Sequence, residues 1–210
     1  MTRLLFVKAS PRDAASRSVA VAQSYLDALR AAQPELEVDT IDLWEENLPQ
    51  FDGNRANAKL AIITGQTHSD TQKTVWDEIV AIAARFTSAD RYLFAVPMWN
   101  GGIPYRLKQY IDIIHQPGLT FGLDPQTGYF GLLKNKRATL VYTSGAFSVE
   151  APAPAFGVDH HSTCMKDWLA QAGVTDVEEI RYQPTLLSVD PEGDFARAKQ
   201  VAAARATAFG

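Results

Sequence analysis

The stretch RYLFAVPMWNGGIP, residues 91–104, decides the fold. Its first six residues form a short apolar run that Pro97 ends, which is typical of a buried strand in a parallel sheet. A tryptophan and two glycines follow. Apolar residues then recur at helical spacing from Ile103 to Ile114, with Pro104 near the start, where a helix tolerates proline. The stretch therefore predicts a strand, a loop and a helix, in that order.

The same alternation extends along the chain in both directions. Other predicted strands cover residues 4–7, 37–43, 138–142 and 177–182. Other predicted helices cover residues 19–29, 75–86, 159–172 and 195–209, with a short helix followed by a loop at 54–65. Residues 119–131 are rich in glycine and aromatics and predict a hairpin or excursion. The pattern predicts an α/β fold with a doubly wound, five-stranded parallel sheet of flavodoxin-like order and helices on both faces, in one domain over residues 1–210.

Composition limits the classes of partner. The chain of 210 residues is 46% hydrophobic and 21% charged, with a formal net charge of −4. This charge disfavours a general affinity for nucleic acid or an anionic membrane, which requires a basic face. Cys164 is the only cysteine, so no intrachain disulfide forms, as suits a reducing compartment. With no signal sequence at the N-terminus and no apolar run near the roughly 20 residues of a membrane helix, we expect a cytoplasmic protein.

The loop after the first strand is suited to a phosphate. In open α/β sheets, ligands lie outside the carboxyl ends of the strands. Residues 10–18 supply three hydroxyls, two guanidiniums and the unpaired amides of a helix N-terminus, all of which favour an anion. The structural alternative is an N-cap serine with solvated arginines. The loop lacks the glycines and lysine of a Walker loop and the glycine triplet of a dinucleotide fingerprint.

Two further loops are suited to a flat ligand. In the loop after Pro97, glycines allow close backbone approach, and Asn100 can both donate to and accept from the edge of a flavin ring. The alternative is an ordinary turn in which Trp99 packs. In the loop 143–147, small residues expose backbone amides and Phe147 is positioned to cover a ring face, although a tight turn is again the alternative.

Together, these loops resemble the FMN-dependent NADH-azoreductase and quinone-reductase family, which has a flavodoxin-like fold. The resemblance covers nearly the whole chain. It is carried by SRS at 16–18, PMWNGGIP at 97–104, LKQYID at 107–112, GLL at 131–133, and WL at 168–169 leading to GVTDV at 173–177.

The resemblance implies a role for each loop. The FMN phosphate would be held by Ser10, Ser16, Arg17 and Ser18. The isoalloxazine ring would be lined by Pro97, Met98, Trp99, Asn100 and Gly101. Its pyrimidine end would meet Ser144, Gly145, Ala146 and Phe147. Trp99 and Phe147 would also form the acceptor pocket, and no metal is implied.

The chain departs from the family pattern at two places. The family often has an aromatic residue where Gly101 stands, and often has arginine-glycine-glycine where this chain has Gly145-Ala146-Phe147. FMN binding is compatible with the second departure if backbone amides, and not an arginine side chain, bind the flavin there. Both departures bear on the choice of acceptor.

The resemblance also implies an activity and an assembly. NADH or NADPH would reduce FMN, and a quinone or azo acceptor would then be reduced in its place, in a ping-pong mechanism. The active form would be a homodimer with the flavin near the interface. Exposed aromatics at the carboxyl edge of the sheet would support this, namely Trp99, Tyr105, Phe121, Tyr129, Phe130 and Phe147.

Two rival functions are weighed. A flavodoxin-type FMN electron carrier needs no pocket wall, so the aromatic segment from Phe121 to Phe130 argues against it. A flavin-free receiver-type regulator needs an acidic cluster after the first strand, where this chain has Ser10-Pro11-Arg12.

Three residue types receive no catalytic role. His160 and His161 are interpreted as a surface pair at a helix start, because no ligand cluster accompanies them. Cys164 is interpreted as a buried small hydrophobe and Asp112 as a solvated or capping group.

Overall fold

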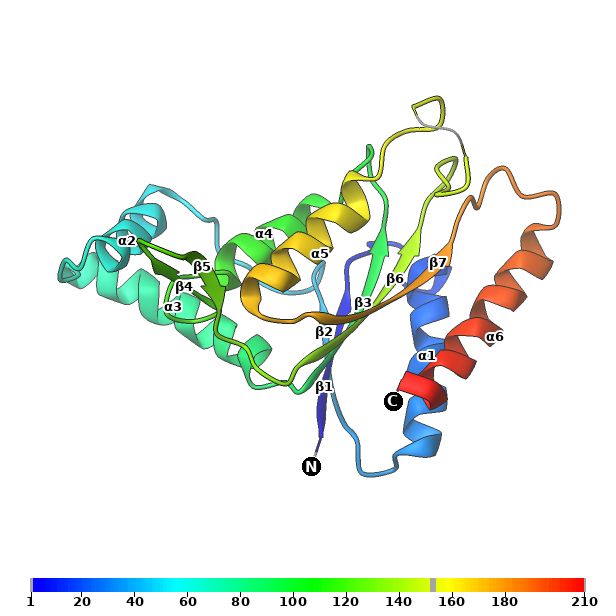
Figure 1. Ribbon diagram of the computed structural model, residues 1–210, viewed down its shortest axis with the longest axis horizontal. Coiled ribbons are helices and arrows are strands. Elements are labelled where there is room, and N and C mark those ends of the chain that lie inside the picture. The colour runs from blue at the N-terminus through cyan, green and yellow to red at the C-terminus, as the bar shows by residue number, and fades with distance from the viewer. Residues whose placement is uncertain (1, 152–153, 210) are drawn as a thin grey trace.

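The computed structural model describes residues 2–151 and 154–209 and has a five-stranded parallel sheet at its centre (Figure 1). The sheet strands are β1 (Arg3–Lys8), β2 (Glu37–Asp42), β3 (Arg91–Pro97), β6 (Arg137–Thr143) and β7 (Asp176–Tyr182). The helices are α1 (Arg17–Ala32), α2 (Gly53–Ile63), α3 (Asp70–Thr87), α4 (Tyr105–Ile114), α5 (His160–Ala172) and α6 (Pro191–Phe209). A short 3-10 turn, η1 (Asp13–Ala15), precedes α1, and β4 (Phe121–Asp124) and β5 (Gly128–Gly131) form a separate antiparallel hairpin.

The order of the strands is β2-β1-β3-β6-β7, and every pairing in the sheet is parallel. With the hairpin left aside, this is the flavodoxin-like order that the sequence predicts. The chain leaves β1 toward one edge and returns to its other side at β3. The crevice of such a sheet opens at that reversal, outside the carboxyl ends of the strands.

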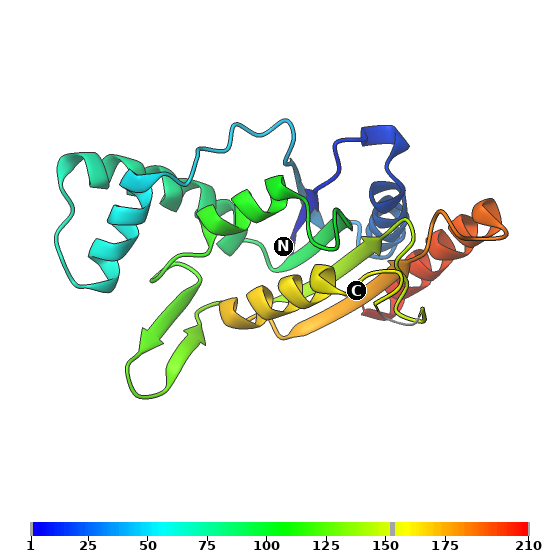
Figure 2. The ribbon, with the colours of Figure 1, turned by 90° about the horizontal axis from the view of Figure 1, so that it is seen from above.

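Both faces of the sheet are buried, which explains the unbroken apolar runs. Successive side chains of a strand point to opposite faces. Thus Leu4 and Phe6 pack with α1 and α6, while Leu5 and Val7 pack with α3, α4 and α5. Figure 2 shows α1 and α6 on one side of the sheet and α4 and α5 on the other.

The ends of the helices follow local chemistry. Ser16 caps α1, Ser69 and Gln72 form a capping box at α3, and the Asp159 side chain accepts from the Ser162 amide at α5. Gly173 ends α5 at φ 97°, a left-handed conformation that glycine adopts without strain.

The hairpin lies at the end of the sheet opposite to that expected. It connects the carboxyl end of α4 to the start of β6, and the Leu133 amide donates to the Ala172 carbonyl, at the end of α5, at 3.0 Å. Residues 121–130 therefore form the predicted hairpin but do not wall a cavity beside the carboxyl ends of the strands. The reason is connectivity, since a segment between a helix and the next parallel strand returns to the amino end of the sheet.

Candidate functional site

One cavity opens at the carboxyl ends of β1, β3, β6 and β7. It collects residues from all three predicted loops and from a fourth segment after β7. Its lining consists of Ser10, Pro11, Arg12, Ser16, Arg17, Pro97, Met98, Trp99, Thr143, Ser144, Gly145, Thr185 and Leu186. The site residues predicted by the sequence therefore meet in space, apart from Ser18, Asn100, Gly101, Ala146 and Phe147, which lie outside the lining.

The end of the cavity at α1 is built for an anion. The Ser16 hydroxyl accepts from the Val19 amide at 3.3 Å and lies 3.2 Å from the Ser18 hydroxyl, and Ser10, Ser16 and Ser18 are all buried. The backbone amides of Arg17 and Ser18 donate no hydrogen bond within the described part of the chain. Two unpaired donors at the start of a 16-residue helix carry the positive end of its dipole, which favours a phosphate.

The two arginines beside this end differ in their contacts. The Arg17 guanidinium lies 4.2 Å from the centre of the Phe195 ring and 2.9 Å from a Glu192 carboxylate oxygen, both on α6. The Arg12 side chain is exposed and makes no ion pair with the described residues. Arg17 is thus already positioned at the rim, whereas Arg12 has its full charge available to a ligand.

The loop after β3 is a tight hairpin turn. The amides of Trp99 and Gly102 each donate to the other's carbonyl at 2.9 Å, and the two central residues have φ angles of 49° and 83°. Positive φ at both positions is the pattern of a type I′ turn, for which Asn-Gly is strongly preferred. Asn100 and Gly101 therefore serve the turn, and Pro97, Met98 and Trp99 reach the cavity.

An aromatic cluster supports this turn. Trp44, from the loop after β2, lies 5.5 Å from Trp99 and 5.3 Å from Tyr105 between ring centroids. Its indole nitrogen donates to the Ala9 carbonyl at 3.1 Å, which fixes it at the end of β1. The sequence reasoning missed Trp44, although its place directly after a predicted strand put it at the ligand edge of the sheet.

The loop after β6 offers backbone donors. The Ser144 hydroxyl donates to the Phe147 carbonyl at 2.5 Å, and the amides of Gly145 and Ala146 make no hydrogen bond within the described residues. The Phe147 side chain is buried away from the cavity. Phe147 thus does not line this cavity in the single subunit, and its role in the acceptor pocket stays a prediction.

The fourth segment, Thr185 and Leu186, was also missed. The Thr185 amide donates to the Ser144 carbonyl at 2.8 Å and the Leu186 amide donates to the Gly145 carbonyl at 2.9 Å. These bonds hold the segment against the loop after β6. The segment could have been found from its position after the fifth predicted strand, because ligands of open α/β sheets lie outside the carboxyl ends of all the strands.

The two histidines are not a surface pair. His160 is exposed, but His161 has no exposed surface, and its Nε2 lies 2.9 Å from the Val96 carbonyl. Burial lowers the pKa of His161 to about 4, so the ring is neutral and Nε2 is the donor. This hydrogen bond joins α5 to the carboxyl end of β3, directly before the cavity. Cys164 is half-buried, and burial raises the pKa of its thiol, so it is an unreactive group.

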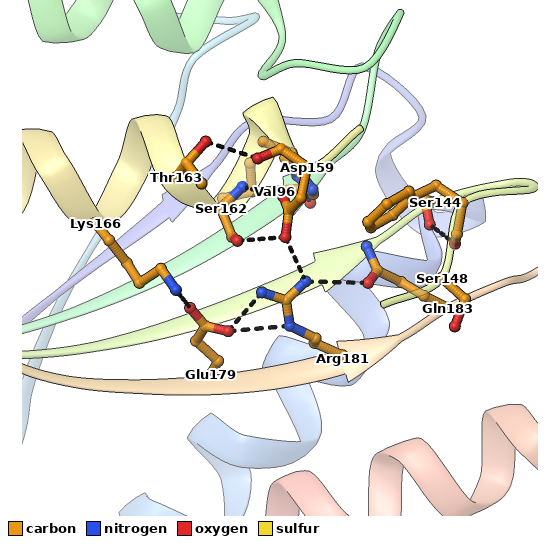
Figure 3. A network of polar contacts seen from close by, with 12 residues as sticks. Val96, Ser144, Ser148, Asp159, Ser162, Thr163, Lys166, Glu179, Arg181 and Gln183 are labelled. Carbon is orange, nitrogen blue, oxygen red and sulfur yellow. Dashed lines mark hydrogen bonds and ion pairs between the residues drawn. The ribbon is translucent and has the colours of Figure 1, made fainter. Parts of the chain in front are cut away.

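A polar network supports the same side of the site from the edge strand β7. Figure 3 shows the Arg181 guanidinium between two carboxylates, with Glu179 at 2.6 Å and Asp159 at 3.2 Å. It also donates to the Gln183 side chain at 3.3 Å, and Lys166 pairs with Glu179 at 3.0 Å. Burial alone would raise the pKa of Asp159, but the Ser162 hydrogen bonds and the Arg181 charge outweigh it and lower the pKa. The network joins β7 to the start of α5.

Within residues 2–151 and 154–209, no three His, Cys, Asp or Glu side chains gather into a group that could hold a metal ion. Among the same residues, no helix has both the length and the apolarity needed to cross a bilayer.

Comparison with known proteins identifies the family. A family model described as a flavodoxin-like fold matches residues 2–206. An FMN-dependent NADH:quinone oxidoreductase of Ruegeria pomeroyi is 50% identical over 198 residues, which is 94% of this chain and 97% of that protein. A protein of the same description from Desulfotalea psychrophila is 40% identical, covering 95% of this chain and 93% of its own. This chain belongs to that family of flavodoxin-like proteins.

A solved structure agrees with the family in fold. The crystal structure of an azoreductase from Bacillus anthracis superposes with a TM-score of 0.88 at 26% identity, over 100% of each chain. The resemblance that the sequence suggested is thus confirmed, and so is the flavodoxin-like sheet.

Proposed function

We propose that this chain is an FMN-dependent oxidoreductase that takes electrons from NADH and reduces quinones, with azo compounds as a second class of acceptor. The observation that carries the proposal is the cavity itself. Its lining includes Arg17 at the start of α1 and Gly145 in the loop after β6, each with an unpaired amide among the described residues, and Met98 and Trp99 from the strand between them. A phosphate at one end and a flat, carbonyl-bearing ring at the other match this arrangement.

The cavity lining suggests which groups would hold FMN. The phosphate would be held by the amides of Arg17 and Ser18, the Ser10 and Ser16 hydroxyls, and the Arg12 and Arg17 guanidiniums at the rim. Its negative charge meets the positive end of the α1 dipole, and each charge-assisted hydrogen bond contributes about 1.5–3 kcal/mol. The pyrimidine end of the ring meets the amides of Gly145 and Ala146, which favour negative charge there without reorganising.

When bound, FMN supplies the two-electron chemistry that links a nicotinamide donor to an acceptor. The protein orients both partners. Trp99 gives a stacking face, held in place by Trp44 and Tyr105. His161 has no exposed surface and a pKa of about 4, so it neither reaches a substrate nor donates a proton at neutral pH. His161 is therefore not a general acid for the reaction, and solvent can protonate a quinol product.

The flavodoxin-type carrier remains the second candidate. The hairpin lies away from the cavity of its own subunit, so the aromatic segment no longer argues against it by itself. Trp44, Trp99 and Tyr105 now carry that argument, because they line the approach to the ring with stacking surface. Such a surface would suit an acceptor ring that is reduced directly at the flavin.

The decisive experiment is an absorbance spectrum of purified protein, followed by anaerobic NADH. We expect an FMN spectrum that bleaches in one two-electron step and recovers on addition of a quinone. Bleaching that requires a reductase partner would support the carrier. No flavin spectrum, even after FMN is added, would contradict both.

We also propose a homodimer in which the hairpin of one subunit lies near the cavity of the other. Two exposed apolar groups support this, on α2 and on the hairpin. They comprise Leu60, Ile62, Ile63, Leu123, Tyr129, Phe130 and Leu132. Of the aromatics expected to be exposed, Phe121 and Phe147 are buried within the subunit, while Tyr105, Tyr129 and Phe130 remain exposed. Such surface on a monomer usually marks a partner site, and a twofold interface uses it twice.

Light scattering tests the dimer. We expect a mass near twice the 23.1 kDa of one chain. Tyr129→Ser with Phe130→Ser should shift the mass toward one chain and lower quinone turnover, whereas Val201→Ser, at an exposed apolar position on α6, should do neither. A fully active monomer would contradict the proposal.

We further propose that residues 1–210 form one domain, which the shared five-stranded sheet supports. We also propose a cytoplasmic location, which the single cysteine supports.

A further inference from the structure

The segment Thr185–Leu186 forms a wall of the cavity that none of the family motifs contains. Its two amides are bonded to the carbonyls of Ser144 and Gly145 at 2.8 and 2.9 Å. It therefore extends the edge of the sheet by a short stretch of backbone pairing beyond β7. The Leu186 side chain lies against the part of the cavity where the loop after β6 presents its unpaired amides.

Leu186 occupies space that a side chain at position 145 would need. A Cβ built on Gly145 would lie 2.9 Å from Leu186 Cδ1, closer than real Cβ contacts. The glycine and the leucine are therefore neighbours, and a β-carbon at position 145 would make the flexible, exposed Leu186 side chain rotate away. In the subunit alone, 79% of the Leu186 surface is exposed, so a flat ligand in the cavity would bury much of it.

The neighbouring leucine provides a contrast. Leu187 is also exposed, at 54%, but it lines a different hollow between the same segment and α6. Of these two adjacent leucines, only Leu186 lines the proposed cofactor cavity.

We propose that Leu186 is a specificity-determining residue that contacts the ring of bound FMN beside the Gly145 and Ala146 amides and keeps that edge free of a cationic side chain. The proposal rests on the function proposed above. Negative charge on the reduced ring is stabilised there by backbone dipoles alone. An apolar neighbour lowers the local polarity, which disfavours the charged form relative to the oxidised one. The pair Gly145 and Leu186 thus keeps bound FMN a stronger reductant than a cation at the same place would.

The test places a charge at each leucine in turn. In Leu186→Lys, reduced FMN should gain about tenfold in affinity relative to oxidised FMN, which raises the two-electron midpoint potential by about 30 mV. The matched control, Leu187→Lys, adds the same charge one residue away and should change that ratio by less than about twofold. Potentials are measured against a reference dye, and affinity for oxidised FMN by fluorescence titration.

A second pair of variants tests contact rather than charge. Gly145→Ala should weaken the binding of oxidised FMN about threefold because its Cβ makes the Leu186 side chain rotate off the ring, and the same change in a Leu186→Ala background should leave the affinity unchanged. Equal potentials for the two lysine variants, or equal losses in the two backgrounds, would overturn the proposal. A failure of the unaltered chain to bind FMN would overturn the proposed function and this inference together, whereas FMN binding with equal potentials overturns only the inference.

Discussion

The two ends of the cavity are built differently. At the phosphate end, donors come from one continuous helix, and three buried serines surround its first turn. At the ring end, three separate segments meet, after β3, β6 and β7, each held by contacts with other elements. The difference teaches that one end is specified by local sequence and the other by tertiary packing. It follows that substitutions at the phosphate end should change the affinity for FMN. Substitutions at the ring end should change the free energy of unfolding and the choice of substrate.

The largest expected effect is at the phosphate end. Ser16→Ala with Arg17→Ala removes a hydroxyl and a guanidinium, which at about 3 kcal/mol together weakens FMN binding about a hundredfold. Fluorescence titration measures it, with circular dichroism to confirm folding. As a control, Glu192→Gln removes the carboxylate that competes for Arg17 and should leave affinity equal or slightly higher. Unchanged affinity in the double variant would remove the distinction between the two ends.

Acid should weaken the ring end through His161. Its pKa is lowered by burial from 6.5 to about 4, so the unfolded chain binds the proton more readily than the folded chain. The His161 contribution to the free energy of unfolding therefore falls as pH drops through the window from 6.5 to 4, by about 2 kcal/mol between pH 7 and pH 5. His115, whose pKa burial also lowers to about 4, adds a loss of its own in the same window. Urea unfolding at the two pH values measures this loss. His161→Gln, which cannot take up a proton, should show a loss smaller by that amount, and an identical loss would contradict the assignment.

The turn after β3 gives a smaller effect. Gly101→Ala forces a β-carbon into a φ of 83°, at a cost of about 1–2 kcal/mol in unfolding free energy. The space around the new carbon is open, with no atom closer than 4.0 Å, so strain and not collision is the cause. Gly53→Ala, at the start of α2 with nothing nearby, is the control and should not destabilise. Thermal unfolding compares the two, and equal midpoints would mean that the turn is not a source of stability.

The smallest effect concerns the acceptor. Trp99→Ala removes a stacking face worth about 0.5–1.5 kcal/mol, so the quinone KM should rise about fivefold while most FMN stays bound. Tyr105→Ala removes only its support and should raise KM less. If FMN affinity falls as much as KM rises, Trp99 belongs to the cofactor cradle.

Sequence predicted what depends on short-range pattern. The strand runs, the helix face from Val75 to Phe86 and the hydroxyl-rich loop all lie where expected, because periodicity and capping act over a few residues. Trp44, Leu186 and the burial of His161 could not be derived in this way. Each depends on which elements become neighbours, for example α5 with the end of β3, and that is decided by the sheet order. The position of the hairpin was missed for the same reason.

One feature of the cavity bears on how the cofactor and the fold depend on each other. Its lining extends along the chain from Ser10 to Leu186, and β1 pairs with the central strand β3 across more than eighty residues. No fragment that stops before β7 contains a complete site, so a nascent chain cannot capture FMN until almost all of it has been synthesised. Binding then selects the finished fold alone and adds its whole free energy to resistance against unfolding, about 2.7 kcal/mol at a hundred times Kd. The chain with FMN bound should therefore resist proteolysis better than the same chain without it.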